Sequence, residues 1–389
     1  MITLLEILSD NPIENVITCM RYRVDKVVFF GPADLMEKYF ETSSAFLKAV
    51  CGVADVKSAE TEPHSLDGTI AVMSSVIAGF GKEERVFLDV TGGSDTALIA
   101  AGIVSEKYAI PLHSFDVKSG ELFFLKDRPN AKISEAAAER TVSCSIDDYI
   151  KLHGGAINYH LHKSKKGKDM LENEAAVLKL ISIYKHHKAV WAAFSSFIAK
   201  KTGKESLSFN ASADKLKKML RTEFPQIGSV KTLKQILGEL RSAGLLSEYR
   251  YKEEVCRFSF KSAFVQDVIS ETGCVLEMIA YLAEKEQSDD CVIGCHIDWD
   301  GVIHEAGDVI NEIDVISIRN GIPCFVSCKS GTLQGVNYAR ALNELYLLAE
   351  KFGGKYARKK LYVSSGLCET SPSNLTRARE MGIELVEVG

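Results

Sequence analysis

Two neighbouring β-like runs in the last third of the chain carry acids and a lysine at strand spacing. Glu312 and Asp314 are two residues apart in the first run, and Ser327 and Lys329 are two residues apart in the second. Alternate residues of a strand share a face, and the Asn-Gly dipeptide between the runs is a strong hairpin signal. A hairpin would bring two acids and a lysine to one end of a small sheet. Such a group suits metal-dependent phosphodiester cleavage; the alternative is a surface hairpin with solvated charges.

A helix that precedes these runs holds a further candidate acid. The pattern over Gly273–Lys285 is amphipathic, and Glu277 lies within it among leucine, isoleucine and alanine. A glutamate is expensive to bury without a partner. This cost favours a metal ion or a basic group near Glu277 over simple core packing.

Length and composition indicate a multidomain globular protein. The chain has 389 residues, 46% hydrophobic and 25% charged, with a net charge of -5, so two or three domains are expected. The charge argues against a nucleic-acid coat protein but is compatible with a local basic groove. No apolar run approaches the roughly 20 residues of a membrane span, and the first residues lack a signal-peptide pattern. The ten cysteines include no CxxC, so we expect a cytoplasmic protein with no disulfides and no membrane partner.

Strand-like and helix-like segments alternate up to about residue 127. Buried strand patterns at Val24–Gly31 and Arg85–Val90 are each followed by a helical pattern. The alternation predicts a doubly wound, Rossmann-like α/β sheet, in which ligands bind beyond the carboxyl ends of strands.

Two polar loops are the candidate ligand sites of this sheet. The candidate residues are Thr91, Gly92, Gly93 and Ser94 in one loop, and Asp10, Asn11 and Asn15 in the other. Glycines let the backbone approach a ligand, hydroxyls can donate to it, and the helix that follows the first loop offers its N-terminal amides to an anion. The alternatives are a tight strand-to-helix turn for the two glycines and a helix cap before Pro12 for the second loop.

The middle of the chain, from about Pro129 to Phe264, is mostly helical. A helical pattern that ends at Gly244 is followed by an alternating ribbon, which is the outline of a winged-helix unit. We expect this unit to act in packing rather than in DNA binding, because several glutamates dilute its positive charge. Two basic segments, His162–Lys168 and the lysines from Lys351 to Lys360, are either solvated surfaces or contacts for a phosphate backbone.

The last third resembles the PD-(D/E)xK restriction-endonuclease-like nucleases. Gly273, Leu276, Glu277, Asp314 and Lys329 carry this resemblance. The first domain, with DVTGG after a strand, resembles CRISPR-associated Rossmann fold (CARF) domains, and the whole chain is similar to the CARF nucleases of type III CRISPR systems. We therefore expect an α/β fold with a CARF domain over residues 1–140, a helical and winged-helix-like segment over 141–268, and a nuclease domain over 269–389.

This resemblance implies a homodimer whose CARF domains bind a cyclic oligoadenylate, with cyclic tetra-adenylate as the expected ring. Binding would activate cleavage of DNA, with RNA open as a second substrate. It also implies that Asp314, Glu277 and the Cys328 carbonyl hold Mg2+ or Mn2+, and that Lys329 orients water or stabilises developing charge.

The sequence departs from the family pattern at two positions. Ser327 stands where the nuclease motif has an acid, so Glu344 on the following long helix is a candidate replacement, with a solvated helical face as its alternative. Asp95 stands where CARF domains often carry lysine, and its charge would repel phosphates. Two further functions remain open: a ligand-responsive winged-helix regulator that binds DNA, and a restriction or repair nuclease that needs no activator.

Overall fold

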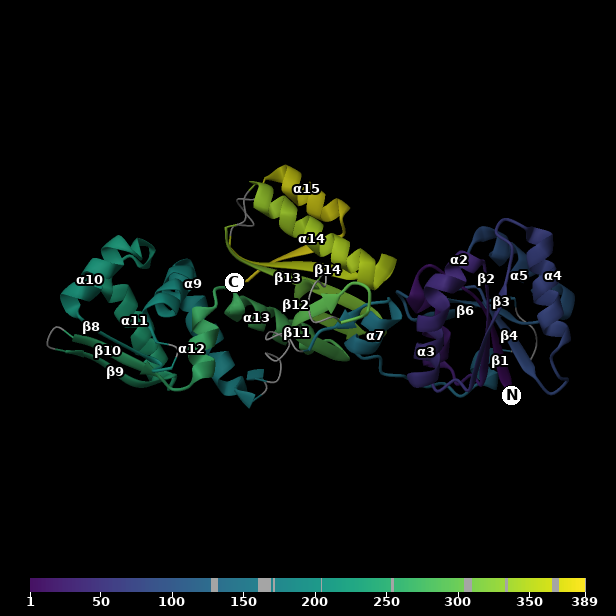
Figure 1. The fold of residues 1–389 in the computed structure, drawn as a ribbon, viewed down its shortest axis with the longest axis horizontal. Helices are drawn as coiled ribbons and strands as arrows, with labels where there is room; N and C mark the ends of the chain where they lie inside the picture. Colours follow the sequence, from purple (N-terminus) through teal and green to yellow (C-terminus); the bar gives the residue numbers. More distant parts are fainter. Residues whose placement is uncertain are drawn as a thin grey trace.

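The computed structural model describes residues 1–126, 132–159, 169–170, 172–203, 205–252, 255–303, 310–332, 335–365 and 371–388. The basic segment His162–Lys168 lies outside these ranges. The molecule is elongated, with one sheet at each end and a third between them (Figure 1). Within the described residues, no helix has the length and apolar character needed to cross a membrane.

The N-terminal sheet is parallel except at one edge and has the order β3-β2-β1-β4-β5-β6. Its strands are β1 (Ile2–Ile7), β2 (Lys26–Gly31), β3 (Asp55–Glu60), β4 (Arg85–Asp89), β5 (Leu112–Asp116) and the antiparallel β6 (Glu121–Lys126). The strand order reverses between β1 and β4, and doubly wound sheets bind ligands beyond the carboxyl ends of the strands at such a point; we call this region the crevice. Both candidate ligand loops lie at this point, as the alternating pattern predicted.

Helices cover both faces of this sheet (Figure 1). One face carries η1 (Pro12–Asn15), α1 (Ile17–Arg21), α2 (Ala33–Leu35), η2 (Met36–Phe40) and α3 (Glu41–Ala49), and the other carries α4 (Leu66–Ala78) and α5 (Asp95–Tyr108). Apolar side chains of β1 and β2 alternate between the two cores, as expected for strands buried on both faces. The short α6 (Ile133–Ala136) follows this domain.

The middle unit has the helix, strand and ribbon order of a winged helix. It consists of α9 (Glu174–Lys201), β8 (Ser208–Ser212), α10 (Ala213–Thr222), η4 (Pro225–Ile227), α11 (Val230–Ser242), β9 (Leu246–Lys252), β10 (Val255–Phe260) and α12 (Ala263–Ser270). The strands form an antiparallel sheet in the order β8-β10-β9. The winged-helix outline expected from the sequence is therefore present, at the end of the molecule opposite the N-terminal sheet (Figure 1).

The C-terminal sheet has the order β15-β14-β13-β12-β11-β7. Its elements are α7 (Ile146–Leu152), β7 (Ala156–Ile157), α13 (Cys274–Lys285), β11 (Asp290–Asp298), β12 (Ile310–Arg319), β13 (Ile322–Thr332), α14 (Gly335–Gly353), η5 (Gly354–Tyr356), β14 (Arg358–Ser365), α15 (Pro372–Glu380) and β15 (Ile383–Glu387). α13 packs on one face, and α14 with α15 on the other. Because β7 pairs with β11, residues 156–157 belong to this sheet and not to the middle segment that the sequence suggested.

Candidate functional site

The expected hairpin exists, and Asp314 lies where its two strands diverge. The antiparallel ladder between β12 and β13 runs from Arg319–Ile322 to Val315–Val326. Asp314 is the next residue of β12, and its carboxylate accepts a hydrogen bond from the Cys328 N–H, with an N–Oδ2 distance of 2.6 Å. β13 meanwhile continues along β14. The carboxylate therefore occupies the fork between two strands that share a sheet.

A reversal of side-chain faces marks this same position. The paired residues Ile293 and Val315 pack on the α13 side, whereas the paired residues Cys295 and Ile313 pack in the opposite core. In a regular strand, residues two apart share a face. Gly294, between the two pairs, has a φ of +63°, a conformation that glycine adopts without a Cβ penalty. The strict alternation expected around Asp314 is therefore wrong, and the break lies at Asp314.

The surroundings of Asp314 disfavour its charged form. Burial raises the pKa of this carboxyl, and the nearby Glu312 acts in the same direction, while the Cys328 amide, Lys329 and Ser327 act against them. The Ser327 hydroxyl donates a longer hydrogen bond of 3.3 Å to Oδ2. Ser327 thus occupies the place of the expected motif acid as a hydrogen-bond donor to Asp314. Because burial disfavours the charged form of this carboxylate, a nearby cation would stabilise that form.

Glu277 approaches the fork from α13. Its side chain is only 8% exposed, and a Cβ placed on Gly273 would lie 3.8 Å from both Glu277 Oε1 and Ser330 Oγ. The pKa of the Cys328 thiol is raised by burial first and then by the carboxylates of Asp314 and Glu277. The two acids therefore act on one residue of β13.

Oxygen donors dominate this group, which suits a hard divalent cation. Mg2+ is commonly held by one or two carboxylates and completes its shell with water and substrate phosphate oxygens. Asp314 and Glu277 fit that pattern, and the Cys328 carbonyl points to the same side of β13 as its N–H. Within the described ranges, no cluster of three or more His, Cys, Asp or Glu side chains has metal-binding geometry. The donor set fits Mg2+ or Mn2+ only with backbone, water or phosphate oxygens added.

The second candidate region lies at the reversal of strand order. A Cβ on Gly92 would fall 2.4 Å from Glu14 Oε2 and 2.6 Å from Ser9 Cβ, and a Cβ on Gly93 would fall 2.2 Å from Ile7 Cγ2. Gly93 also has a φ of +119°. The two loops predicted to flank one pocket are therefore in direct contact, and the glycines make that contact possible.

Several polar side chains of these loops already have partners inside the protein. Thr91 donates to Asp89 and accepts from the Phe115 N–H, and Asn15 bonds to both backbone groups of Ser9. These two residues order the loops, so the expectation that their side chains face a ligand is not supported by the geometry.

The remaining predicted residues of the loops differ in exposure. Asp10 and Ser94 are exposed, although Ser94 also caps α5 by accepting from the Ala97 N–H. Asn11 is buried, its amide atoms have no hydrogen-bond partner among the described residues, and it lies against Gly354. Asp10, Ser94 and the backbone of the two glycines are thus the accessible groups of the crevice.

Two buried acids, Glu6 of β1 and Asp89 of β4, lie opposite one another near the ends of these strands. Burial alone would raise the pKa of Asp89, but His113 and the hydroxyls of Thr18 and Thr91 outweigh it and lower that pKa. The pKa of Glu6 is raised well above its usual value by burial and by neighbouring carboxylates. The surroundings therefore favour the protonated form of Glu6 and the charged form of Asp89.

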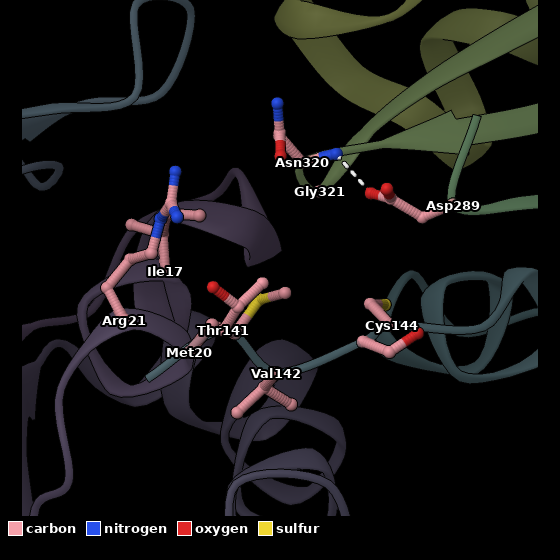
Figure 2. A pocket seen from close by; sticks show the side chains of 10 residues that line it. Ile17, Met20, Arg21, Thr141, Val142, Cys144, Asp289, Asn320 and Gly321 are labelled. Carbon is pink, nitrogen blue, oxygen red and sulfur yellow. Dashed lines mark hydrogen bonds between the residues drawn. The ribbon is translucent and has the colours of Figure 1, made fainter. Parts of the chain in front are cut away.

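The turn of the β12–β13 hairpin is a contact between domains. A Cβ on Gly321 would lie 3.5 Å from Ile13 Cδ1 and 3.6 Å from Ile17 Cδ1. Beside it is a cavity of about 270 Å³, where the Asn320 N–H donates to Asp289 across 2.6 Å (Figure 2). Gly321 is therefore buried against the N-terminal domain, while Arg319 and Asn320 of the same turn are exposed.

Two solved structures resemble the chain along essentially its whole length. The structure of protein VC1899 from Vibrio cholerae matches with a TM-score of 0.74 and 17% identity, covering 99% of this chain and 94% of that one. Can2 from Sulfobacillus thermosulfidooxidans, solved with cyclic tetra-adenylate, matches with a TM-score of 0.62 and 15% identity, covering 100% and 96%. The chain has the fold of Can2. No family model and no curated protein sequence matches it.

This likeness in fold confirms the expected α/β fold class, with a Rossmann-like N-terminal sheet, a winged-helix-like unit and a C-terminal α/β sheet. Within this fold, Glu344 lies apart from the fork. Its side chain is exposed on α14 and pairs with Arg340, with an Nε–Oε1 distance of 2.7 Å. α14 also packs on the opposite face of the sheet from the helix that carries Glu277. The geometry favours the solvated-face interpretation of Glu344.

The basic residues near the end of α14 do not form an open track. Lys355 pairs with Glu14 at 2.7 Å, Lys359 with Glu350 at 2.9 Å, and Lys360 with the buried Glu284 at 2.7 Å. Their charges are compensated by carboxylates within the fold, so the phosphate-backbone interpretation of this cluster is wrong for these lysines. Sequence spacing could not reveal the partners, two of which come from other segments.

Glu14 is the functional candidate that sequence reasoning missed. It is 2% exposed and accepts from Ser9 Oγ at 2.6 Å, from Tyr356 Oη at 2.5 Å and from Lys355 Nζ at 2.7 Å. It thereby joins the crevice of the N-terminal sheet to η5 of the C-terminal domain. The only signal in the sequence was an acid placed among the polar residues after β1.

Proposed function

We propose that this chain is a metal-dependent nuclease activated by a cyclic oligoadenylate, most simply cyclic tetra-adenylate. The observation that carries the proposal is the convergence of Asp314, Glu277 and Lys329 at the fork of β12 and β13. The resemblance to CARF nucleases of type III CRISPR systems and the Can2 fold, solved with cyclic tetra-adenylate, support it.

The chain's own residues have separate tasks in this mechanism. Mg2+ or Mn2+, held by Asp314, Glu277 and the Cys328 carbonyl, would polarise the scissile phosphate and lower the pKa of water. The Cys328 N–H fixes the orientation of Asp314 through Oδ2. Lys329, on the same strand and half-buried, would orient the attacking water or stabilise charge on the phosphate oxygens.

The activator would bind in the crevice at the reversal of strand order. The backbone of Gly92 and Gly93, the exposed Ser94 and the N-terminus of α5 supply donors for phosphate groups. Asp10 and Asp95 are exposed at the same edge, so we assign them to ribose or base contacts, away from phosphate. The resemblance to CARF domains supports this placement.

We propose a homodimer through the exposed face of α5. Ile99 and Ile103 are one helical turn apart and are 56% and 42% exposed. Two large apolar side chains left open beside the ligand crevice favour association with a second copy. A two-fold axis at α5 would present two equal sets of donors to a cyclic ligand with repeated phosphates.

A contact between domains gives activation a physical route. Glu14 touches the Gly92 loop on one side and binds Tyr356 and Lys355 on the other. η5 leads directly into β14, which pairs with β13 and places Val363 opposite Lys329. A ligand that changes the conformation of the crevice loops would therefore move the strand that carries Lys329. This requires that the ligand binds the inactive and active conformations with different affinity. This continuity disfavours a nuclease without an activator.

Cleavage assays on the wild-type chain test the proposal. Supercoiled plasmid, single-stranded DNA and RNA are each incubated with Mn2+ or EDTA, and with cyclic tri-, tetra- or hexa-adenylate or none. We expect DNA cleavage only when both the metal and one cyclic oligoadenylate are present. Equal cleavage with and without every ring would leave the unregulated nuclease as the better account, and tight DNA binding without cleavage under all conditions would favour the regulator.

A further inference from the structure

The winged-helix unit carries a charge opposite in sign to the rest of the protein. Residues 200–261 contain 14 Lys or Arg and 7 Asp or Glu, a net charge of +7, whereas the remaining residues sum to -12. The glutamates of this unit dilute its positive charge but leave a clear excess of cations. A local field of this kind attracts polyanions even when the whole molecule is acidic.

The two helices of the unit turn these cations to solvent. α10 and α11 bury Leu216, Leu233 and Leu237 in the core of the unit. Their opposite faces expose basic residues, which are Lys215, Lys217, Lys218 and Arg221 on α10 and Lys231 and Lys234 on α11. Of these, Lys217 pairs with a neighbouring acid on its own helix. The other exposed cations have no carboxylate within ion-pair distance among the described residues.

The ribbon adds a like-charged pair. Arg250 of β9 and Arg257 of β10 are directly opposite in the antiparallel register and both are exposed. Glu248 pairs with Arg257, with an Nε–Oε2 distance of 3.3 Å. Lys252 is exposed on the same strand as Arg250. The ribbon therefore adds exposed cations to those of the two helices.

We infer that the winged-helix unit is the duplex-DNA-binding arm of this protein. In this arrangement α11 enters a major groove while α10 and the β9–β10 ribbon contact the phosphate backbone. The B-form major groove admits a helix, whereas the deep and narrow major groove of A-form RNA does not. The unit lies at the end of the molecule, joined to the C-terminal sheet through α9, α12 and α13 (Figure 1), so bound DNA would extend toward the fork. The choice of DNA as the partner rests on the proposed nuclease function. The basic surface itself does not depend on that function.

Binding of duplex DNA to the full chain tests the inference. A 30-base-pair fluorescent duplex is titrated in EDTA, which prevents cleavage, at several salt concentrations. The variant Lys218→Ala, Lys231→Ala, Lys252→Ala removes one cation from each of α10, α11 and β9. The matched control, Lys48→Ala, Lys57→Ala, Lys82→Ala, removes three exposed lysines from the N-terminal domain.

We expect the first variant to bind DNA about tenfold more weakly or worse, whatever the sequence, with a salt slope smaller by about one unit for each lost phosphate contact. The control should bind like the wild type, and circular dichroism should show both variants folded. Equal binding by the two variants would overturn the inference, as would tighter binding of single-stranded RNA than of duplex DNA at the same surface.

This experiment separates the inference from the proposed function. If the wild-type chain binds DNA through these lysines but never cleaves it, the binding arm stands and the nuclease proposal fails. If the chain cleaves DNA with metal and activator while the first variant binds and cleaves like the control, only the binding arm fails.

Discussion

The hydroxyl of Tyr356 donates a 2.5 Å hydrogen bond to Glu14 Oε1, and this bond joins the C-terminal domain to the ligand crevice. Burial and the Glu14 carboxylate raise the pKa of Tyr356, so the phenol remains a donor at all physiological pH values. Glu14 is nearly fully buried and shares its other oxygen with Ser9. The bond is therefore a rigid link between a loop of one domain and a turn of another.

Tyr356→Phe removes this link while keeping the ring. We expect the ratio of cleavage rates with and without activator to fall by about tenfold, since one buried hydrogen bond to a charged group contributes on the order of 1.5–3 kcal/mol. Activator affinity and activated cleavage are measured together. Tyr249→Phe, a half-buried tyrosine of the winged-helix unit, is the matched control. A variant with an unchanged ratio would show that the signal takes another route.

Asp314→Asn should abolish cleavage without destabilising the metal-free protein at neutral pH. Burial raises the pKa of Asp314, so folding favours its protonated form. Its contribution to stability is present below the unfolded pKa and is lost as pH rises through the folded pKa. The neutral asparagine avoids that loss, and we expect a higher unfolding free energy than that of the wild type near pH 7.

The comparison is made by urea unfolding in EDTA at about pH 7 and at about pH 4, which is close to the ordinary pKa of an aspartate. The difference between variant and wild type should shrink at the lower pH. A variant that is less stable than the wild type at neutral pH would indicate that the carboxylate is held by partners stronger than the Cys328 amide.

The sequence revealed the elements of the candidate nuclease site because strand and helix periodicities are local. The spacing of Asp314 and Lys329 in two β-branched runs and the position of Glu277 in an apolar helix sufficed to bring them together. The face reversal at Gly294 was not predictable, because it depends on one backbone conformation that glycine permits but does not require.

Long-range partners explain the other differences. Lys355 looked like a solvated or phosphate-binding cation, but Glu14, more than 300 residues away, neutralises it. Thr91 and Asn15 looked like ligand donors, and their hydrogen bonds are used to hold the loops. Loops at strand ends contain the same polar residue types whether their side chains bind a ligand or bond to one another. Only the three-dimensional contacts distinguish ligand-binding residues from residues that hold the loop.

Gly93→Ala should destabilise the N-terminal domain by about 1–3 kcal/mol. The added methyl group would overlap Ile7, and the backbone φ of +119° disfavours an alanine. Gly81→Ala is the control, because a Cβ at Gly81 has no atom within 4 Å. Thermal unfolding of both variants measures the effect. A shift no larger than that of the control would show that the two crevice loops separate at little cost.

Charges placed on α5 should separate the proposed dimer. Ile99→Glu together with Ile103→Glu puts two carboxylates on the face that would meet its own copy, and like charges across an interface disfavour association. Analytical ultracentrifugation should show a monomer for this variant and a dimer for the wild type. Leu347→Glu, which changes an exposed leucine on α14, is the matched control. A dimer that survives the α5 charges would place the interface elsewhere.

Lys329→Ala tests the central claim most directly. The variant and the wild type are given supercoiled plasmid, Mn2+ and cyclic tetra-adenylate, and binding of the labelled activator is measured in parallel. We predict that the wild type converts the plasmid to nicked or linear product, and that Lys329→Ala binds the activator equally well but yields no product above the metal-free background. Full cleavage by Lys329→Ala would contradict the assignment of the fork between β12 and β13 as the catalytic site.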